Sequence, residues 1–116
     1  METQRMIAPI ETFVQLDIRA GRVVTAAAFP EARKPALRLL IDFGKTLGMK
    51  RSSAQITDLY TSESIVGCMV VAVVNFPPKR IAGFDSEVLV LGVPDQDGAI
   101  VLLQPERSVA PGSRVY

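Results

Sequence analysis

The stretch "CMVVAVVNFPPKRIAGFDSEVLVLGVPDQDGAIVLLQP" (residues 68–105) decides the fold, because three apolar runs alternate in it with two connections rich in turn residues. The runs 68–76, 87–94 and 99–105 are short and rich in Val, Leu and Ile, as strands are. The second connection ends in Asp-Gly, a strong signal for a β-hairpin. The stretch therefore predicts three strands and a β-sheet architecture.

Working outward, three more strands are predicted at 18–29, 36–44 and 48–56, with "PEARKP" (30–35) breaking the chain after the first. One helical turn is predicted within 57–67, capped by Thr61 or Ser62 and ended by Gly67. A short helix or turn is predicted at 9–17, because Pro9 is tolerated in a first helical turn. Six strands with little helix predict an all-β, small closed barrel.

The composition fits one domain over residues 1–116, since 48% hydrophobic residues are enough for a core without disulfides. The formal net charge of +1 gives no overall attraction to nucleic acid or to anionic membranes. Cys68 is the single cysteine, which excludes an intramolecular disulfide and favours a reducing compartment. Neither a signal sequence nor a membrane-spanning run is recognisable, so we expect a soluble, cytoplasmic protein with no membrane insertion.

The strand pattern does not fit a barrel that is alone in water. A small antiparallel barrel should alternate apolar and polar residues, yet 69–74, 88–93 and 100–103 are apolar at nearly every position. Both faces of these strands should therefore be covered. Either the N-terminal segment folds over the barrel, or a second copy of the chain covers it; we favour a twofold homodimer to which the helix at 9–17 contributes.

Most catalytic chemistry is missing from the sequence. The absence of histidine excludes triads with an imidazole base and zinc sites that need His, and a single cysteine excludes thiolate zinc sites. "GKT" (44–46) lacks the earlier glycine of a phosphate loop, and "DQDG" (95–98) is favoured as a turn over part of a calcium loop. We predict a binding module that is not an enzyme and has no cofactor and no metal.

Positive charge gathers in three segments that lie apart in the sequence. They contribute Arg33, Lys34 and Arg38, then Lys50 and Arg51, then Lys79 and Arg80. If the three segments meet on one side of the barrel, they form a basic rim that contacts phosphates with salt-sensitive affinity. The alternative for each cation is an ordinary solvated surface position.

Apolar side chains accompany these cations in "NFPPKRIAGFDSE" (75–87), where Phe76, Ile81 and Phe84 alternate with prolines and a glycine. Splayed RNA bases stack on such aromatic side chains while phosphates meet the cations. An extended unfolded peptide with apolar and acidic groups suits the same surface. The third interpretation is that the two phenylalanines only plug the end of the barrel.

The segments "LDIRAGRV" (16–23), "FPEARKPALRLLIDFG" (29–44), "KRSSAQIT" (50–57), "VVNFPPKRIAGFDSEVLVLG" (73–92) and "VLLQP" (101–105) resemble the tRNA-binding-domain family, and within it the CsaA-like branch of bacterial export-related chaperones. The resemblance extends from about Phe13 to Val115. It implies an OB-fold barrel, a homodimer, and on each protomer a hydrophobic pocket beside a positive patch that takes unfolded or pre-export polypeptides.

In the wider family, "N-L-x-P-[KR]-x-[LI]-x-G-x-x-S-x-G-M" carries part of the tRNA-binding surface. The positions that match here are Asn75, Pro78, Lys79, Arg80, Gly83 and Ser86. Val88 and Leu89 replace the glycine and methionine, Phe29 replaces the histidine of "H-P-x-A-D-[KR]-L", and Arg33 is inserted. These departures resemble the chaperone branch and favour peptide binding over tRNA delivery to a synthetase.

The sequence thus predicts an ATP-independent, homodimeric chaperone of unfolded or pre-export polypeptides, with tRNA as a further partner. The alternative is a tRNA-binding module acting with an aminoacyl-tRNA synthetase, and a third hypothesis is a structural subunit docked on a synthetase or secretion factor. The predicted peptide-binding residues are Phe29, Phe76, Ile81 and Phe84. The predicted RNA-binding or basic-rim residues are Arg33, Lys34, Lys50, Arg51, Asn75, Lys79, Arg80, Ser86 and Glu87, where Glu87 orients a cation by pairing with it.

Overall fold

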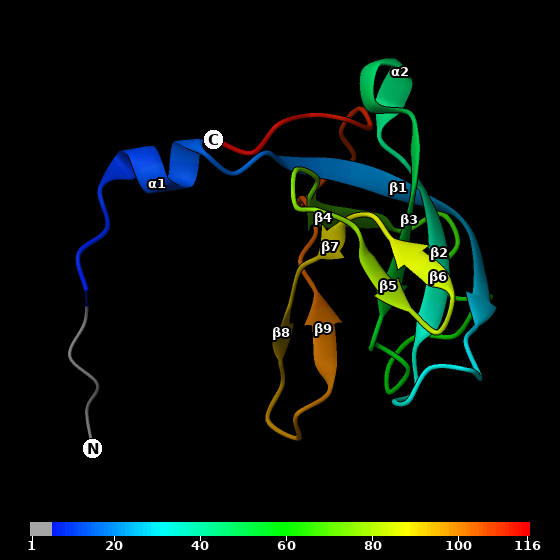
Figure 1. Ribbon diagram of the computed structural model, residues 1–116. Coiled ribbons are helices and arrows are strands. Elements are labelled where there is room, and N and C mark those ends of the chain that lie inside the picture. The colour runs from blue at the N-terminus through cyan, green and yellow to red at the C-terminus, as the bar shows by residue number, and fades with distance from the viewer. Residues whose placement is uncertain (1–5) are drawn as a thin grey trace.

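The structure is a computed structural model that describes residues 6–116. Its elements, in chain order, are α1 (Ile10–Val14), β1 (Ile18–Ala28), β2 (Leu37–Asp42), α2 (Gly44–Leu47), β3 (Met49–Ala54), β4 (Met69–Val73), β5 (Lys79–Ile81), β6 (Phe84–Ser86), β7 (Leu89–Val90), β8 (Gly92–Pro94) and β9 (Ile100–Leu102). The main sheet has the order β3-β2-β1-β4-β7, and β5-β6 and β8-β9 are separate hairpins. The sheet curls into a small, nearly closed barrel (Figure 1), as the sequence predicts.

The long strand β1 organises the barrel because it pairs antiparallel with both β2 and β4. Its register with β2 shifts between Val23 and Thr25, which is a β-bulge that bends the strand between its two partners. Glycine is required at position 21 of β1, because a Cβ atom there would lie 2.7 Å from the side chains of Ile41 and Phe43. The absence of a side chain at Gly21 lets β1 pass close to these two core residues.

The core lies inside this curved sheet. Alternate positions of β2 point inward, so that Leu37, Leu39 and Ile41 are buried while Arg38 is exposed. Ile65, in the connection between β3 and β4, is fully buried and belongs to the same core cluster. Fully burying such a side chain contributes about 1.5–3 kcal/mol. The core is mainly aliphatic, and Phe43 is its largest fully buried side chain.

The connection 57–67 differs in detail from its prediction. It forms consecutive hydrogen-bonded turns, in which the Ile65 N–H donates to the Thr61 carbonyl over 3.2 Å and the Ser64 N–H donates to Thr61 Oγ1 over 3.0 Å. Thr61 is thus the capping residue, as one of the two predicted candidates, and Gly67 ends the segment with φ +90°. Ile65 is buried, whereas Val66 is exposed.

The segment 77–86 was predicted as a loop and instead contains the hairpin β5-β6. Its two-residue turn is Ala82-Gly83, and both residues have positive φ, +47° and +82°. Turns of this kind have the twist that antiparallel strands need, and they usually place Asn or Asp where Ala82 stands. Because alanine carries no turn signal, the hairpin could not be read from the sequence.

The strand predicted at 87–94 is split. β7 pairs with β4, and Leu91 then changes partners: its N–H donates to Val71 O and its carbonyl accepts from the Leu103 N–H. From Gly92 onward the chain pairs with β9 around the predicted Asp-Gly turn. The chain thus leaves the main sheet at Leu91, and the β8-β9 hairpin extends below the barrel in Figure 1.

The helix α1 is shorter than the predicted 9–17 and does not cover the barrel. Figure 1 shows it projecting sideways from the start of β1, and it has no buried residue. Ile7 is 97% exposed and Ile10 is 68% exposed. Residues 6–14, named the N-terminal arm from here on, therefore leave the apolar strand faces uncovered, contrary to the alternative in which this segment folds over the barrel.

The C-terminal segment holds the base of the N-terminal arm. The Val115 N–H donates to the Ile18 carbonyl, and the Arg114 guanidinium donates to the carbonyls of Val14 and Leu16. Arg19 donates to the Asp17 carboxylate, and this hydrogen bond raises the pKa of the Arg19 guanidinium. The arm therefore starts from a fixed base although its helix projects into solvent.

Candidate functional site

The candidate site lies along the seam, by which we mean the side of the barrel where β3 meets β6 and β7. Main-chain ladders join β1 to β2, β2 to β3, and β1 to β4, but no ladder joins β3 to β7 among the described residues. The seam is joined mostly through side chains. Ser52 Oγ, which is buried, donates to the Val88 carbonyl over 3.0 Å, and Ser86 Oγ accepts from the Ser53 N–H over 3.0 Å.

Glu87 completes the seam by pairing with Arg51 in three ways. Its Oε1 accepts from the Arg51 N–H over 2.9 Å, its own N–H donates to the Arg51 carbonyl over 2.8 Å, and its carboxylate lies 3.5 Å from the Arg51 guanidinium. Arg51 is the cation beside the Glu87 carboxylate, and the role of Glu87 in orienting a cation for a ligand stays a prediction. The carboxylate thus takes the place of a neighbouring strand for the Arg51 N–H.

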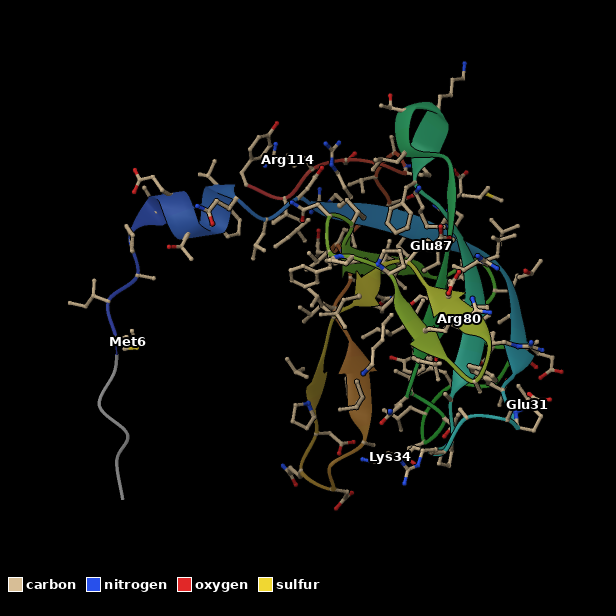
Figure 2. The ribbon with its side chains drawn as sticks, viewed as in Figure 1. Met6, Glu31, Lys34, Arg80, Glu87 and Arg114 are labelled. Atoms are coloured by element: carbon tan, nitrogen blue, oxygen red, sulfur yellow. The ribbon has the colours of Figure 1, made fainter. Side chains whose placement is uncertain are left out.

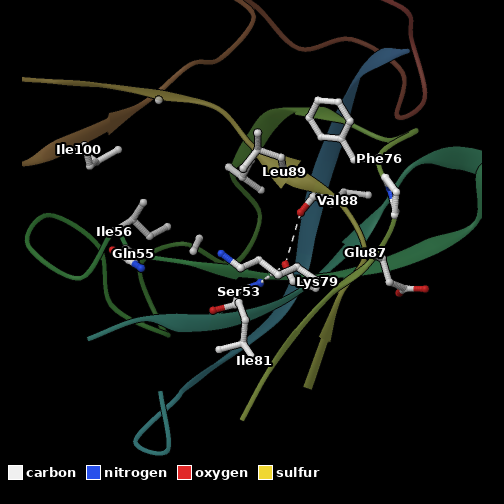
Figure 3. A pocket seen from close by; sticks show the side chains of 15 residues that line it. Ser53, Gln55, Ile56, Phe76, Lys79, Ile81, Glu87, Val88, Leu89 and Ile100 are labelled. Carbon is white, nitrogen blue, oxygen red and sulfur yellow. Dashed lines mark hydrogen bonds between the residues drawn. The ribbon is translucent and has the colours of Figure 1, made fainter. Parts of the chain in front are cut away.

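An apolar groove of about 510 Å³ opens in the seam beside these contacts. Its walls are the end of β3, the β5-β6 hairpin, and the chain from β7 into β8 (Figure 3). Phe76 and Leu89 are 43% and 50% exposed at its rim, so a ligand would bury surface that now faces water. The apolar residues that line the groove are Ala54, Ile56, Phe76, Pro77, Ile81, Val88, Leu89, Val90 and Ile100.

A basic groove of about 940 Å³ lies next to the apolar groove. The loop 31–34 forms one wall and the residues 79–82 of the hairpin form the other. Four cationic residues line it, with Glu31 as the single acidic one: Arg33, Lys34, Lys79 and Arg80. Figure 2 shows Lys34 and Arg80 on the same side of the barrel. The two grooves share Ser53, Gln55, Lys79 and Ile81, so apolar and cationic surfaces meet along one line.

The cations in the basic groove are not equally available. Arg80 and Asp85 face each other in the β5-β6 hairpin, and Arg80 Nη1 donates to Asp85 Oδ1 over 2.7 Å. The charge of Arg80 is therefore already paired. Lys79 makes no ion pair or side-chain hydrogen bond with the described residues. Since Lys79 also lines both grooves, it is the cation best placed to contact an acidic group of a ligand in either of them.

Two predicted aromatic residues lie behind the grooves. Phe29 is 3% exposed and makes an edge contact with Phe84, their ring centroids being 5.4 Å apart. Arg38 stacks over the ring of Phe29 and Arg51 over the ring of Phe84, at 5.3 and 5.5 Å. Neither ring lines the apolar groove or the basic groove, so Phe29 and Phe84 support the hairpin and the loop after β1, while Phe76 and Ile81 line the apolar groove.

Three other predicted residues lie apart from the basic groove. Lys50 stands on the face of β3 shared by the buried residues Ser52 and Ala54, opposite to Arg51 and Ser53. Asn75 uses both its polar atoms at the base of the N-terminal arm, where Oδ1 accepts from the Asp17 N–H and Nδ2 donates to the Gln15 carbonyl, each over 2.9 Å. Ser86 is engaged in the seam.

Several lining residues were not predicted, namely Ser53, Gln55, Ile56 and Ile100. They come from the ends of β3 and β9, which meet the hairpin only after the barrel closes. Leu89 carried a signal, because it stands where the tRNA-binding pattern has methionine, and half its surface is exposed in the groove. Within residues 6–116, no cluster of three or more His, Cys, Asp or Glu side chains is placed to hold a metal ion.

Comparison with known proteins agrees with this geometry. Residues 18–114 match the family described as "Putative tRNA binding domain". The chain is 39% identical to a methionine–tRNA ligase of Porphyromonas gingivalis over 105 residues, and 37% identical to that of Archaeoglobus fulgidus over 115 residues. These stretches cover 90% and 99% of this chain but only 15% and 17% of the two ligases. The likeness to the ligases therefore concerns one part of them.

Among solved structures, the chaperone CsaA of Bacillus anthracis has a TM-score of 0.89 and 55% identity, over 96% of this chain and 100% of that chain. The CsaA chaperone protein of Picrophilus torridus has a TM-score of 0.89 and 44% identity, over 95% of this chain and 100% of that chain. The matches at this identity extend over whole chains. The protein therefore belongs to the tRNA-binding-domain family and, within it, to the group of the CsaA proteins.

Proposed function

We propose that this protein is a homodimeric, ATP-independent chaperone that binds unfolded or pre-export polypeptides in the apolar groove, and that it acts in the cytoplasm. The observation that carries the proposal is the shared line of the two grooves, where exposed apolar side chains lie beside cations without a large net charge on the whole chain. Unfolded chains expose the apolar side chains that such a groove accepts. No helix within residues 6–116 is long and apolar enough to cross a membrane.

The N-terminal arm supports the homodimer. Met6, Ile7, Ile10 and Val14 are 90%, 97%, 68% and 59% exposed, and apolar residues in one continuous stretch are rarely left in water. The arm projects away from its own barrel, so it can reach a second copy (Figure 1). In a twofold dimer the exchange is reciprocal, with each arm covering the partner's apolar surface.

A second candidate function is tRNA binding with an aminoacyl-tRNA synthetase, favoured by the basic groove and by the match to domains of methionine–tRNA ligases. Lys79, Arg33 and Lys34 would contact phosphates there. Binding of this kind depends steeply on salt because phosphate contacts release counterions. This candidate has the weaker support, because Val88 and Leu89 replace the glycine and methionine of the tRNA-binding pattern.

Fluorescence anisotropy with a labelled unfolded polypeptide and with labelled tRNA, each over a salt series, separates the two functions. The proposal predicts polypeptide binding that persists from 0.1 M to about 0.5 M salt, where exposed charges are largely screened. Binding to tRNA alone, lost as salt rises, would replace the chaperone function by the tRNA function. Sedimentation of the 116-residue protein tests the homodimer in the same buffers.

A further inference from the structure

We propose that an extended polypeptide binds the apolar groove as an added β-strand on the free edge of β3. This inference rests on the proposed function and specifies how a client is held. Its basis is the main chain at the end of β3, where Ser53 and Gln55 line the groove and carry an acceptor and a donor on the side away from β2. Side chains select the client in such a mode, and main-chain hydrogen bonds hold it whatever its sequence.

The direction of these main-chain groups follows from the register. Ala54 pairs with Leu37, and the N–H of Ser53 points away from β2, because it donates to Ser86 Oγ. In an antiparallel strand, the N–H and carbonyl of one residue point to the same side, so the Ser53 carbonyl also points away from β2. The planar peptide bond turns the Gln55 N–H to that side as well, opposite to the Ala54 carbonyl. Both groups therefore face the seam.

Neither group has a partner within residues 6–116. No side chain donates to the Ser53 carbonyl, and no hydrogen bond is formed by the Gln55 N–H. In the rest of the seam, the corresponding groups of Arg51 are both engaged by Glu87, whose N–H and carboxylate act as a substitute strand. The substitution ends at Ser53, and the apolar groove begins at the same residue.

The free pair fits one residue of a parallel strand. A residue opposite Ala54 would donate its N–H to the Ser53 carbonyl and accept from the Gln55 N–H with its own carbonyl. An antiparallel strand that used the Ser53 carbonyl would pair with the Ser53 N–H as well, which already donates to Ser86 Oγ, so only a parallel strand uses both free groups. A nucleic acid strand does not carry this alternation of donor and acceptor, and a phosphate would meet the Ser53 carbonyl unfavourably. The occupant is therefore a polypeptide, parallel to β3.

The side chains of the added strand would find matching surfaces. Successive side chains point to opposite faces of a strand, so an apolar residue can enter among Ile56, Leu89 and Ile100 while its neighbours stay outside. Lys79 lines both grooves and would meet an acidic neighbour of that residue; Figure 3 shows its side chain among those lining the apolar groove. The predicted client segment is thus short and extended, with an apolar residue next to an acidic one.

An N-methyl scan of a peptide tests this binding mode without changing the protein. The probe is a fluorescein-labelled nine-residue peptide with one central Leu, flanked by Glu on one side and by Ser and Thr elsewhere. We expect methylation of the main-chain N–H that meets Ser53 to weaken binding about tenfold, and methylation of the two adjacent residues to change it less than twofold, since their N–H groups point away. Equal tolerance at every position would overturn strand addition and leave the proposed function standing.

Two variants at one position test the same hydrogen bonds from the protein side. Gln55→Pro removes the main-chain N–H, whereas the matched control Gln55→Ala removes only the side chain. We expect Gln55→Pro to weaken binding of the unmethylated peptide about fivefold relative to Gln55→Ala, with both variants folded by circular dichroism. Equal affinity of the two variants would contradict the inference, and if Gln55→Pro does not fold, the N-methyl scan decides. Failure of the wild-type protein to bind any unfolded polypeptide would overturn the proposed function and this inference together.

Discussion

The two sides of this barrel are built differently. On the side of β1, β2 and β4, continuous antiparallel ladders enclose fully buried side chains such as Leu39, Ile41 and Val70. On the seam, β3 is held to β6 and β7 by Ser52, Ser86 and Glu87, and a groove opens where these contacts end. The difference shows how one small fold can be stable and still keep main-chain and apolar surface free for a partner. The ladder side supplies stability, and the seam supplies the binding site.

The ladder side should carry the largest effect on stability. Ile41 is fully buried, and truncating it to Ala leaves a cavity that we expect to cost about 2–5 kcal/mol of unfolding free energy. Urea denaturation of Ile41→Ala measures this loss. Polypeptide affinity per folded molecule should be unchanged; a specific loss of affinity with normal stability would contradict the division between the two sides.

A change in the seam should cost less stability than a change in the core. Ser52→Ala leaves the buried Val88 carbonyl without its donor, and we expect a cost of about 1–3 kcal/mol. The same denaturation experiment checks it, with Ser53→Ala as the control, because the Ser53 side chain forms no hydrogen bond with residues 6–116 and only its N–H is engaged. Equal stability of Ser52→Ala and wild type would show that the seam does not depend on this contact.

A change at Asn75 distinguishes the role of the N-terminal arm in the dimer from polypeptide binding in the groove. Because its side chain fixes the base of the N-terminal arm, Asn75→Ala should weaken the homodimer by a few-fold in dissociation constant while polypeptide affinity per protomer stays the same. Analytical ultracentrifugation measures the first quantity and anisotropy the second. A large loss of tRNA binding with an intact dimer would show instead that Asn75 belongs to the tRNA-binding surface, as the family pattern implies.

Lys79→Ala should have the smallest effect of these variants, and it tests the contribution of charge to binding. Lys79→Ala should lower affinity for an acidic polypeptide about threefold at 0.1 M salt and reduce the salt slope of tRNA binding by about one. The matched control is Lys45→Ala, an exposed lysine on α2 outside both grooves. The same effect from both variants would mean that only overall charge matters.

Much of this architecture could be predicted from the sequence. The first four strands and the Asp-Gly hairpin are where the apolar runs and turn residues indicate. The hairpin β5-β6 could not be predicted, because Ala82 adopts a positive φ that its identity does not signal. The end of the strand at Leu91 could not be predicted from the sequence either, because there the chain changes its hydrogen-bonding partner from β4 to Leu103, directly after β9, and this change arises only in the folded barrel.

The candidate site was predicted in part. Loop cations and Phe76 were identified from their clustering, and Arg33, Lys34, Lys79 and Arg80 do gather in one groove. Strand alternation alone separates Lys50 from Arg51, a distinction that a count of charges along the sequence does not make. Ser53 and Gln55 carry no charge or aromatic ring, and their importance lies in the main chain, which every residue shares.

Binding of clients in the apolar groove is tested most directly by comparing Leu89→Ser with Val93→Ser. The two side chains are similarly exposed, 50% and 48%, but only Leu89 lines the apolar groove. The measurement is anisotropy of a labelled unfolded polypeptide at 0.5 M salt, where charge contributes little. If clients bind in the apolar groove, Leu89→Ser should bind about tenfold more weakly, because the burial of a leucine side chain is lost, and Val93→Ser should bind as the wild type does. Equal affinity of the two variants would show that clients do not bind in the seam.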